Sequence, residues 1–127
     1  METLFKYLAV AFGGALGAMA RYLITYSFVS RFFAPFPFAT FFINVSGSFL
    51  IGFILTLIVE RYTISDYWRL FFAVGFLGAY TTFSTFEFET LSLVRGRDFF
   101  NAALYVFLSF VVGFLAVCAG VWLAKKF

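Results

Sequence analysis

The chain has 127 residues, of which 64% are hydrophobic and 12% charged, with a mean hydropathy of +1.01 and a net charge of +3. A soluble domain carries about 25% charged residues and a membrane-spanning helix needs about 20 apolar residues, so we expect one all-α domain of four helices in the lipid bilayer, with no domain outside it. The net charge comes largely from Lys and Arg in the predicted loops, which indicates membrane topology and argues against nucleic-acid binding.

The first helix is predicted at residues 5–32. Its Gly13 and Gly17 are four residues apart, a spacing that lets another helix approach closely. Arg21 follows one turn later on the same face. Because an arginine inside a span usually faces water or a partner, Arg21 is either an anchor that snorkels to the interface or a residue that attracts anions to an aqueous vestibule.

A proline-containing loop is predicted at residues 31–37, and the second helix at 38–60. Thr40, Asn44 and Ser48 are spaced four residues apart and form a polar stripe on this apolar helix. The Asn44 amide has two donor hydrogens and one acceptor oxygen. It either joins helices, which is the commoner role of such residues, or donates to a permeating anion.

The third helix is predicted at residues 67–94, with a break near 78–82. Around the break the sequence reads GFLGAYTTFSTF, which places two glycines and four hydroxyl side chains inside a long apolar stretch. Lipid offers no hydrogen bonds, so an interrupted helix is tolerated where it is buried in protein or lines a wet path. Ion sites of transporters lie at such breaks. The alternative is a packing seam whose hydroxyls bond to the preceding turn; the clustering favours the ion site.

The fourth helix is predicted at residues 99–123, after a tight charged turn. Its Asn101, Tyr105 and Ser109 are again spaced four residues apart. Polar rows on the second and fourth helices, together with a broken third helix, predict one shared polar track.

Basic residues are distributed almost evenly between the two sides of the membrane. Orientation follows the Lys/Arg asymmetry, so a weak bias permits insertion in both directions and hence an antiparallel dimer. Four short helices also enclose little interior, so a pathway lined on all sides is expected to need a second subunit. Five basic residues fall on the side of the termini and three on the other: Lys6, Arg61, Arg69, Lys125 and Lys126 against Arg31, Arg95 and Arg97.

Side chains of the predicted track are mostly hydrogen-bond donors, and no row of carboxylates follows it, since Glu87 and Glu89 are expected toward the membrane surface. Donors suit an anion, and a small anion such as fluoride holds its water tightly, so a pore must replace those hydrogen bonds closely. Phe83 and Phe86 are three residues apart on one helix face. The positive edge of an aromatic ring can meet an anion; ordinary packing is the alternative.

The break also frees backbone carbonyls around Gly78 to Thr81. Carbonyl oxygens are hard ligands that suit a small cation such as Na⁺, and water filling the break is the alternative. The absence of His and the single Cys118 exclude a Cys/His metal cluster and a Cys–His nucleophile. No nucleophile–base pair or phosphate-binding loop is evident, so we expect no enzymatic activity.

Over its whole length the chain resembles the Fluc (CrcB) family of fluoride channels. The most specific match is GFLG followed by TTFSTF, and Tyr80 and Gly113 depart from the family pattern. Tyr80 follows Ala79, where relatives often have a second glycine and a smaller residue, and some relatives carry a hydroxyl at the position of Gly113. Further matches are the Gly-rich first helix ending at Arg21, the run Thr40…Asn44-Val45-x-Gly47, and Tyr105 with Ser109.

This resemblance implies a passive channel in the cell inner (plasma) membrane that exports cytoplasmic fluoride, built as an antiparallel dual-topology homodimer with two pores. It implies that Phe83 and Phe86 meet fluoride with their ring edges, that Asn44 donates in the pore, and that Arg21 lies toward the vestibule. A structural Na⁺ at the dimer centre is implied on the carbonyls of Gly78 and Thr81. The remaining pore candidates are Thr40, Ser84, Thr85, Tyr105 and Ser109.

Two other classes of function were weighed against the channel. A proton-coupled small multidrug transporter also forms four-helix, dual-topology dimers, but it uses a membrane-embedded Glu in its first helix. Here the first helix has no carboxylate after Glu2 and has Arg21 instead. A non-transporting assembly subunit would use the polar rows purely to join helices; it predicts that substitutions in those rows remove assembly and flux together.

Overall fold

The computed structural model describes residues 1–29, 35–62 and 64–127, and most of these residues are helical, with no strand among them. The predicted all-helical fold class is thereby confirmed. Three helices within the described residues are long and apolar enough to cross a membrane: Glu2–Ser27, Phe38–Glu60 and Phe99–Ala124. The chain is therefore a multi-pass membrane protein.

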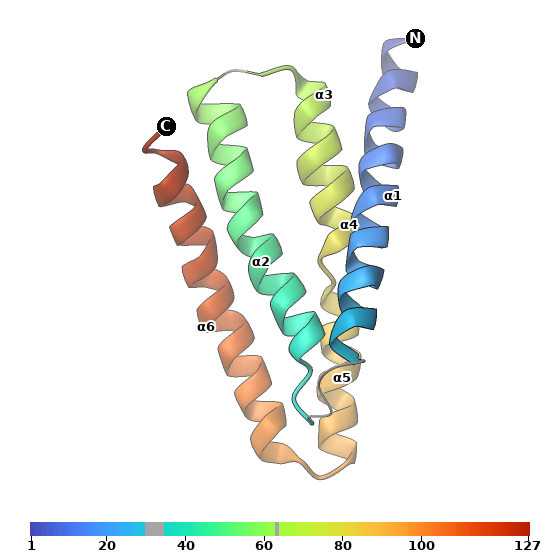
Figure 1. Ribbon diagram of the computed structural model, residues 1–127, viewed down its shortest axis with the longest axis vertical. Helices are drawn as coiled ribbons and strands as arrows, with labels where there is room; N and C mark the ends of the chain where they lie inside the picture. Colours follow the sequence, from blue (N-terminus) through green and yellow to red (C-terminus); the bar gives the residue numbers. More distant parts are fainter. Residues whose placement is uncertain (30–34, 63) are drawn as a thin grey trace.

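Long helices lie beside a rod that is assembled from shorter ones (Figure 1). The long helices are α1 (Glu2–Val29), α2 (Phe38–Leu55), which the π-helical segment η1 (Thr56–Arg61) continues, and α6 (Phe99–Ala124). The rod contains α3 (Asp66–Arg69), the π-helical segment η2 (Leu70–Leu77), α4 (Gly78–Tyr80) and α5 (Phe83–Arg95). The predicted end of the first helix and most of the following loop, residues 30–34, lie outside the described residues.

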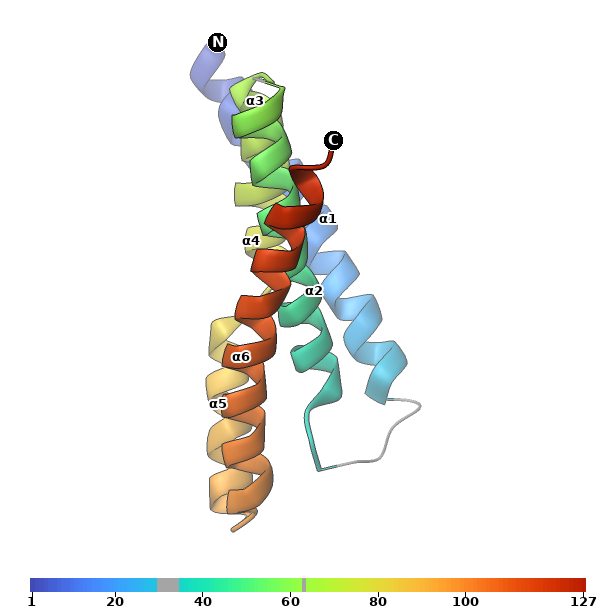
Figure 2. The same cartoon turned by 90° about the vertical axis from the view of Figure 1, so that its left-hand side faces the viewer.

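Both termini and the connection between α2 and α3 lie at one end of the molecule (Figure 1). At the opposite end, α5 and the adjoining half of α6 lean away from the ends of α1 and α2 (Figure 2). The turn between α5 and α6 contains Arg97 in the left-handed conformation, with φ 59°. Asp98 then caps α6, its side chain accepting from the Asn101 amide at 3.2 Å.

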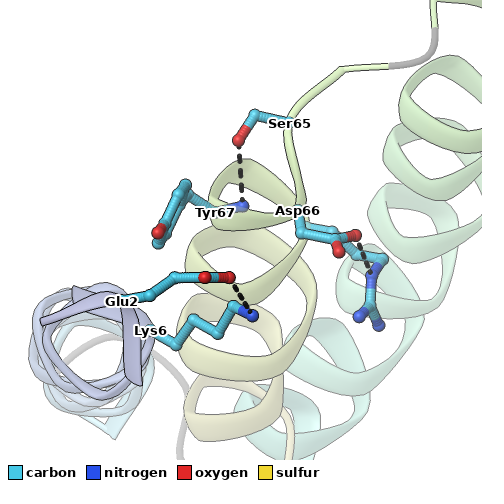
Figure 3. A network of polar contacts seen from close by, with 6 residues as sticks. Glu2, Lys6, Ser65, Asp66 and Tyr67 are labelled. Atoms are coloured by element: carbon cyan, nitrogen blue, oxygen red, sulfur yellow. Dashed lines mark hydrogen bonds and ion pairs between the residues drawn. The ribbon is translucent and has the colours of Figure 1, made fainter. Parts of the chain in front are cut away.

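Polar contacts at the end with the termini are local (Figure 3). Lys6 Nζ donates to Glu2 Oε1 at 2.7 Å within α1, and Ser65 caps α3 by accepting from the Tyr67 amide at 3.4 Å. Such contacts suit the membrane–water interface, where solvent competes for the same groups and surface ion pairs contribute little stability.

Three glycines set the spacing between neighbouring helices. On α1, a Cβ added at Gly13 or Gly17 would overlap a backbone carbonyl oxygen of η2, at Phe71 and Phe76 respectively. On α6, a Cβ at Gly120 would overlap the carbonyl oxygen of Phe49 in α2. Small residues allow this close approach of backbones in membranes, where van der Waals packing drives helix association.

We expect Gly17→Ala to destabilise the protein, because its methyl group would meet backbone and not a movable side chain. Overpacking of this kind costs about 1–3 kcal/mol. The matched control is Gly14→Ala, three residues earlier on the same helix, where the nearest heavy atom to an added Cβ is 3.8 Å away. Thermal denaturation in detergent, followed by size-exclusion chromatography, measures both variants; equal melting temperatures would contradict the prediction.

Candidate functional site

The rod of shorter helices is interrupted at Thr81 and Thr82. Thr81 has φ −79° and ψ 157°, and Thr82 has φ −150° and ψ 117°, so both are extended between α4 and α5. The Thr81 hydroxyl donates back to the carbonyl of Leu77 at 2.9 Å. Thr82 caps α5, its hydroxyl accepting from the Thr85 amide at 3.2 Å. These side chains supply hydrogen bonds that the missing helical turn no longer makes.

Asn44 on α2 holds the interruption from the side. Its Oδ1 accepts from the Thr82 amide at 2.9 Å, and its Nδ2 donates to the Thr82 carbonyl at 3.0 Å. One side chain thus satisfies both backbone groups of an extended residue, which lipid could not satisfy. Because an amide nitrogen carries two hydrogens, one Nδ2 hydrogen is left for a further acceptor.

Two carbonyls at the interruption lose their helical donors. In a continuous α-helix the Thr82 amide would donate to the Gly78 carbonyl, and the Thr85 amide to the Thr81 carbonyl. Here the first of these amides donates to Asn44 and the second to the Thr82 hydroxyl. The Gly78 and Thr81 carbonyl oxygens are therefore released from α-helical pairing, and as hard oxygen ligands they fit a small cation such as Na⁺.

An open cleft of about 430 Å³ lies against the interruption, between α2, α5 and α6. Ser109 Oγ on α6 is buried and has no hydrogen-bond partner among the described residues. The Phe83 and Phe86 rings lie 5.9 Å apart between centroids, and 69% of Phe83 is exposed against 6% of Phe86. The structure brings four predicted pore residues to the cleft, Asn44, Phe83, Phe86 and Ser109, together with Ser48, Thr81, Thr82 and Gly113.

A second cavity, of about 280 Å³, shares Thr82 with the cleft and lies between α1, α2 and α5. It contains the predicted vestibule residue Arg21 and the predicted pore residues Thr40 and Thr85. Glu89 of α5 also lines it. Most of the predicted site residues therefore fall into two groups, one in the cleft and one in the Arg21 cavity, and Thr82 lines both hollows.

Glu89 connects three helices, and the sequence interpretation missed it. Its two carboxylate oxygens accept from Thr40 Oγ1 of α2 and from the Tyr105 hydroxyl of α6, each at 2.8 Å. Tyr105 is fully buried, with its ring between Phe36 and Phe86. No spacing within its own helix pointed to this role, because both donors to Glu89 lie on other helices.

Some predicted residues lie outside both hollows. Tyr105 lines neither, and its hydroxyl is engaged by Glu89. Ser84 is exposed, with its hydroxyl 3.4 Å from that of Thr82. Gly78 is exposed at the start of α4 and lines neither hollow.

We expect Glu89→Ala to destabilise the protein by about 1–3 kcal/mol, because it leaves the fully buried Tyr105 hydroxyl without its acceptor. The control is Glu87→Ala, an exposed carboxylate on the same helix. Adding Tyr105→Phe to Glu89→Ala should recover part of the loss, since it removes one of the two buried hydroxyls that Glu89→Ala leaves without an acceptor. Thermal denaturation in detergent measures the series; a double variant less stable than Glu89→Ala would contradict the account.

Known proteins similar to this chain share its whole membrane-spanning region. Residues 8–121 match the family described as "CrcB-like protein, Camphor Resistance (CrcB)". A protein of Solibacter usitatus is 47% identical over 121 residues, which cover 95% of this chain and 99% of that protein. A protein of Acidobacterium capsulatum is 49% identical over 121 residues, covering 95% and 97%. Both are named fluoride-specific ion channel FluC. The chain therefore belongs to the CrcB family, which its sequence motifs resemble.

Proposed function

We propose that the protein is a fluoride-selective channel that lets fluoride leave the cytoplasm passively across the plasma membrane. The observation that carries the proposal is the cleft beside the interruption. It offers a buried hydroxyl without a partner, at Ser109, the remaining amide hydrogen of Asn44 and the rings of Phe83 and Phe86. None of its lining residues is acidic. The names of the relatives point to the same ion.

Fluoride enters, in this proposal, through the cavity that contains Arg21. The positive charge of Arg21 raises the local concentration of anions. Thr85 lines that cavity, and Thr82 lines both the cavity and the cleft. In the cleft, the donors of Asn44 and Ser109 and the ring edges replace water around the ion. A passive path of this kind needs no coupled proton and no chemical step.

The rod of shorter helices forms the third span of a single four-helix domain in this proposal. The spans are then residues 5–32, 38–60, 67–94 and 99–123, the third broken near 78–82. Support comes from the shared end of the termini and the α2–α3 connection, which an even number of crossings requires (Figure 1). Extended backbone at membrane depth is tolerated because it lies against α2 and lines a cavity.

A second copy of the chain, in antiparallel orientation, completes the pathway in this proposal and gives two pores per dimer. The cleft is open in one chain, and Phe83 on its wall is 69% exposed. A partner covering that side would enclose the ion and shield the ring from lipid. The near-even distribution of basic residues supports insertion in both directions.

A Na⁺ ion at the centre of such a dimer would be held by the carbonyl oxygens of Gly78 and Thr81 of both copies. Their release from helical pairing supports this role. When bound, the cation supplies fixed positive charge that joins the subunits and offsets nearby anions. The chain's own contribution is to hold these carbonyls in place.

The function is tested with purified protein in liposomes loaded with potassium fluoride. Efflux is started with valinomycin and followed with a fluoride electrode, and the same vesicles loaded with chloride report selectivity. We expect fluoride efflux far above that of protein-free liposomes and no comparable chloride efflux. Fluoride efflux equal to that of protein-free liposomes would refute the channel, and comparable chloride efflux would refute its selectivity.

No structural observation favours the proton-coupled transporter. The one carboxylate of α1, on Glu2, is paired with Lys6 near the end of the helix. The charged residue farther along that helix is Arg21, which lines a cavity. A transporter that trades protons for cationic drugs needs the opposite charge there.

A further inference from the structure

One turn of α2 contacts Tyr80 and the two residues of the interruption, Thr81 and Thr82. Asn44 holds the backbone of Thr82. Gly47, one turn later, provides the space for the preceding residues: a Cβ added there would overlap the Thr81 methyl group and approach the Tyr80 ring to 3.3 Å. Ser46 lies 2.9 Å from the Tyr80 hydroxyl, between their oxygen atoms. The Tyr80 side chain thus adds a hydrogen bond to α2, in addition to the two that the Thr82 backbone makes with Asn44.

The direction of the Tyr80–Ser46 hydrogen bond follows from the other contact of Ser46. The Ser46 hydroxyl donates its one proton to the Ile43 carbonyl, at 3.1 Å. A hydroxyl has a single donor and further acceptor capacity, so Tyr80 is the donor and Ser46 the acceptor. Phenylalanine at position 80 therefore removes this bond while keeping the ring.

Tyr80 is fixed at both ends of its side chain. It is 5% exposed, and its ring is stacked on Phe76, with 5.9 Å between centroids. Its backbone is the last helical residue before the extended chain, because α4 continues η2 without a gap and ends at Tyr80. The hydroxyl contact therefore ties this end of the helix to α2, next to the point where helical pairing stops.

We propose that Tyr80 is a positioning residue that, through its hydroxyl on Ser46, orients the carbonyls of Gly78 and Thr81 for cation binding. The two carbonyls flank it in sequence, two residues before and one after, so fixing Tyr80 relative to α2 fixes both. This inference rests on the cation site proposed above. It adds a side-chain contact at position 80 that phenylalanine would not make.

Thermal stability in detergent, measured at increasing Na⁺ and constant ionic strength with N-methyl-D-glucamine, tests the inference without relying on flux. Wild-type protein should melt at higher temperature as Na⁺ rises, with a defined midpoint concentration. Tyr80→Phe and Ser46→Ala should each raise that midpoint about three- to tenfold, the range expected for a hydrogen bond between membrane helices. The double variant should match either single variant, because both remove the same bond. Tyr7→Phe, which removes a hydroxyl from an exposed tyrosine on α1, should leave the midpoint unchanged.

Each outcome decides the inference. A role in stability alone would lower the melting temperature equally at every Na⁺ concentration and leave the midpoint in place, which would overturn the proposal. Additive effects of the two substitutions would also overturn it, since they would act separately. A wild-type protein that conducts fluoride but shows no response to Na⁺ would overturn the cation site and this inference with it, while leaving the channel intact. A wild-type protein that conducts no fluoride would instead refute the proposed function.

Discussion

Asn44→Ala is expected to reduce fluoride efflux about tenfold or more in the liposome assay while leaving the protein assembled. The substitution removes both hydrogen bonds with Thr82, the one that its amide donates and the one that its carbonyl accepts. Unsatisfied backbone groups at membrane depth cost several kcal/mol, and about 1.4 kcal/mol already changes an equilibrium tenfold. The extended residues should therefore shift toward another conformation, which alters the wall shared by the cleft and the Arg21 cavity.

The control for this experiment is Asn101→Ala. Its amide donates to Asp98 three residues earlier, at 2.8 Å, and it lines neither hollow. It should retain fluoride flux close to that of the wild-type protein. Size-exclusion chromatography in detergent reports assembly for both variants. If Asn44→Ala lost assembly and flux together, Asn44 would serve mainly to join helices, as in a non-transporting subunit.

Phe83→Ile is expected to reduce fluoride efflux by a similar factor, about tenfold, with little loss of stability. Phe83 is 69% exposed in a single chain, so its truncation removes little packing from the fold. It lines the cleft, however, and isoleucine has no positive ring edge to offer an anion. The substitution should therefore weaken the interaction with fluoride and leave the packing of the helices largely unchanged.

The matched control is Phe88→Ile, on the same helix. Phe88 is 67% exposed, almost the same as Phe83, but it lines neither hollow. It should conduct like the wild-type protein, and both variants should melt within a few degrees of it. Equal flux in the two variants would show that an exposed ring on α5 has no part in conduction.

Predictions about helices succeeded where local chemistry decides the outcome. The apolar runs indicated membrane helices, and three such helices are long enough to span a bilayer. Gly13 and Gly17 were predicted to allow close approach, and they contact the backbone of η2. The assignment of the chain to the CrcB family followed from the motifs around GFLG and TTFSTF, and the family match over residues 8–121 confirms it.

Predictions about the polar track were less complete, because hydrogen-bond partners come from distant parts of the chain. Sequence placed Thr40 and Tyr105 among the pore donors, but their hydroxyls donate to Glu89, which lies 49 and 16 residues away in sequence. Sequence placed Glu89 toward the membrane surface but did not indicate that it joins α2, α5 and α6 through these two hydrogen bonds. No spacing rule within one helix indicates an acceptor on another.

By itself the sequence determined that this is a helical membrane protein of the CrcB family whose third predicted helix is prone to interruption. Hydropathy and glycine content decide this because they act between neighbours along the chain. The tertiary structure decided which partners the residues at the interruption find. Asn44 and Ser46 on α2 bind the Thr82 backbone and the Tyr80 hydroxyl, and Ser109 Oγ on α6 has no partner within the part of the chain that the structure describes. Hydrogen bonds are short and directional, so these pairings depend on how the helices pack in space and not on the order of residues.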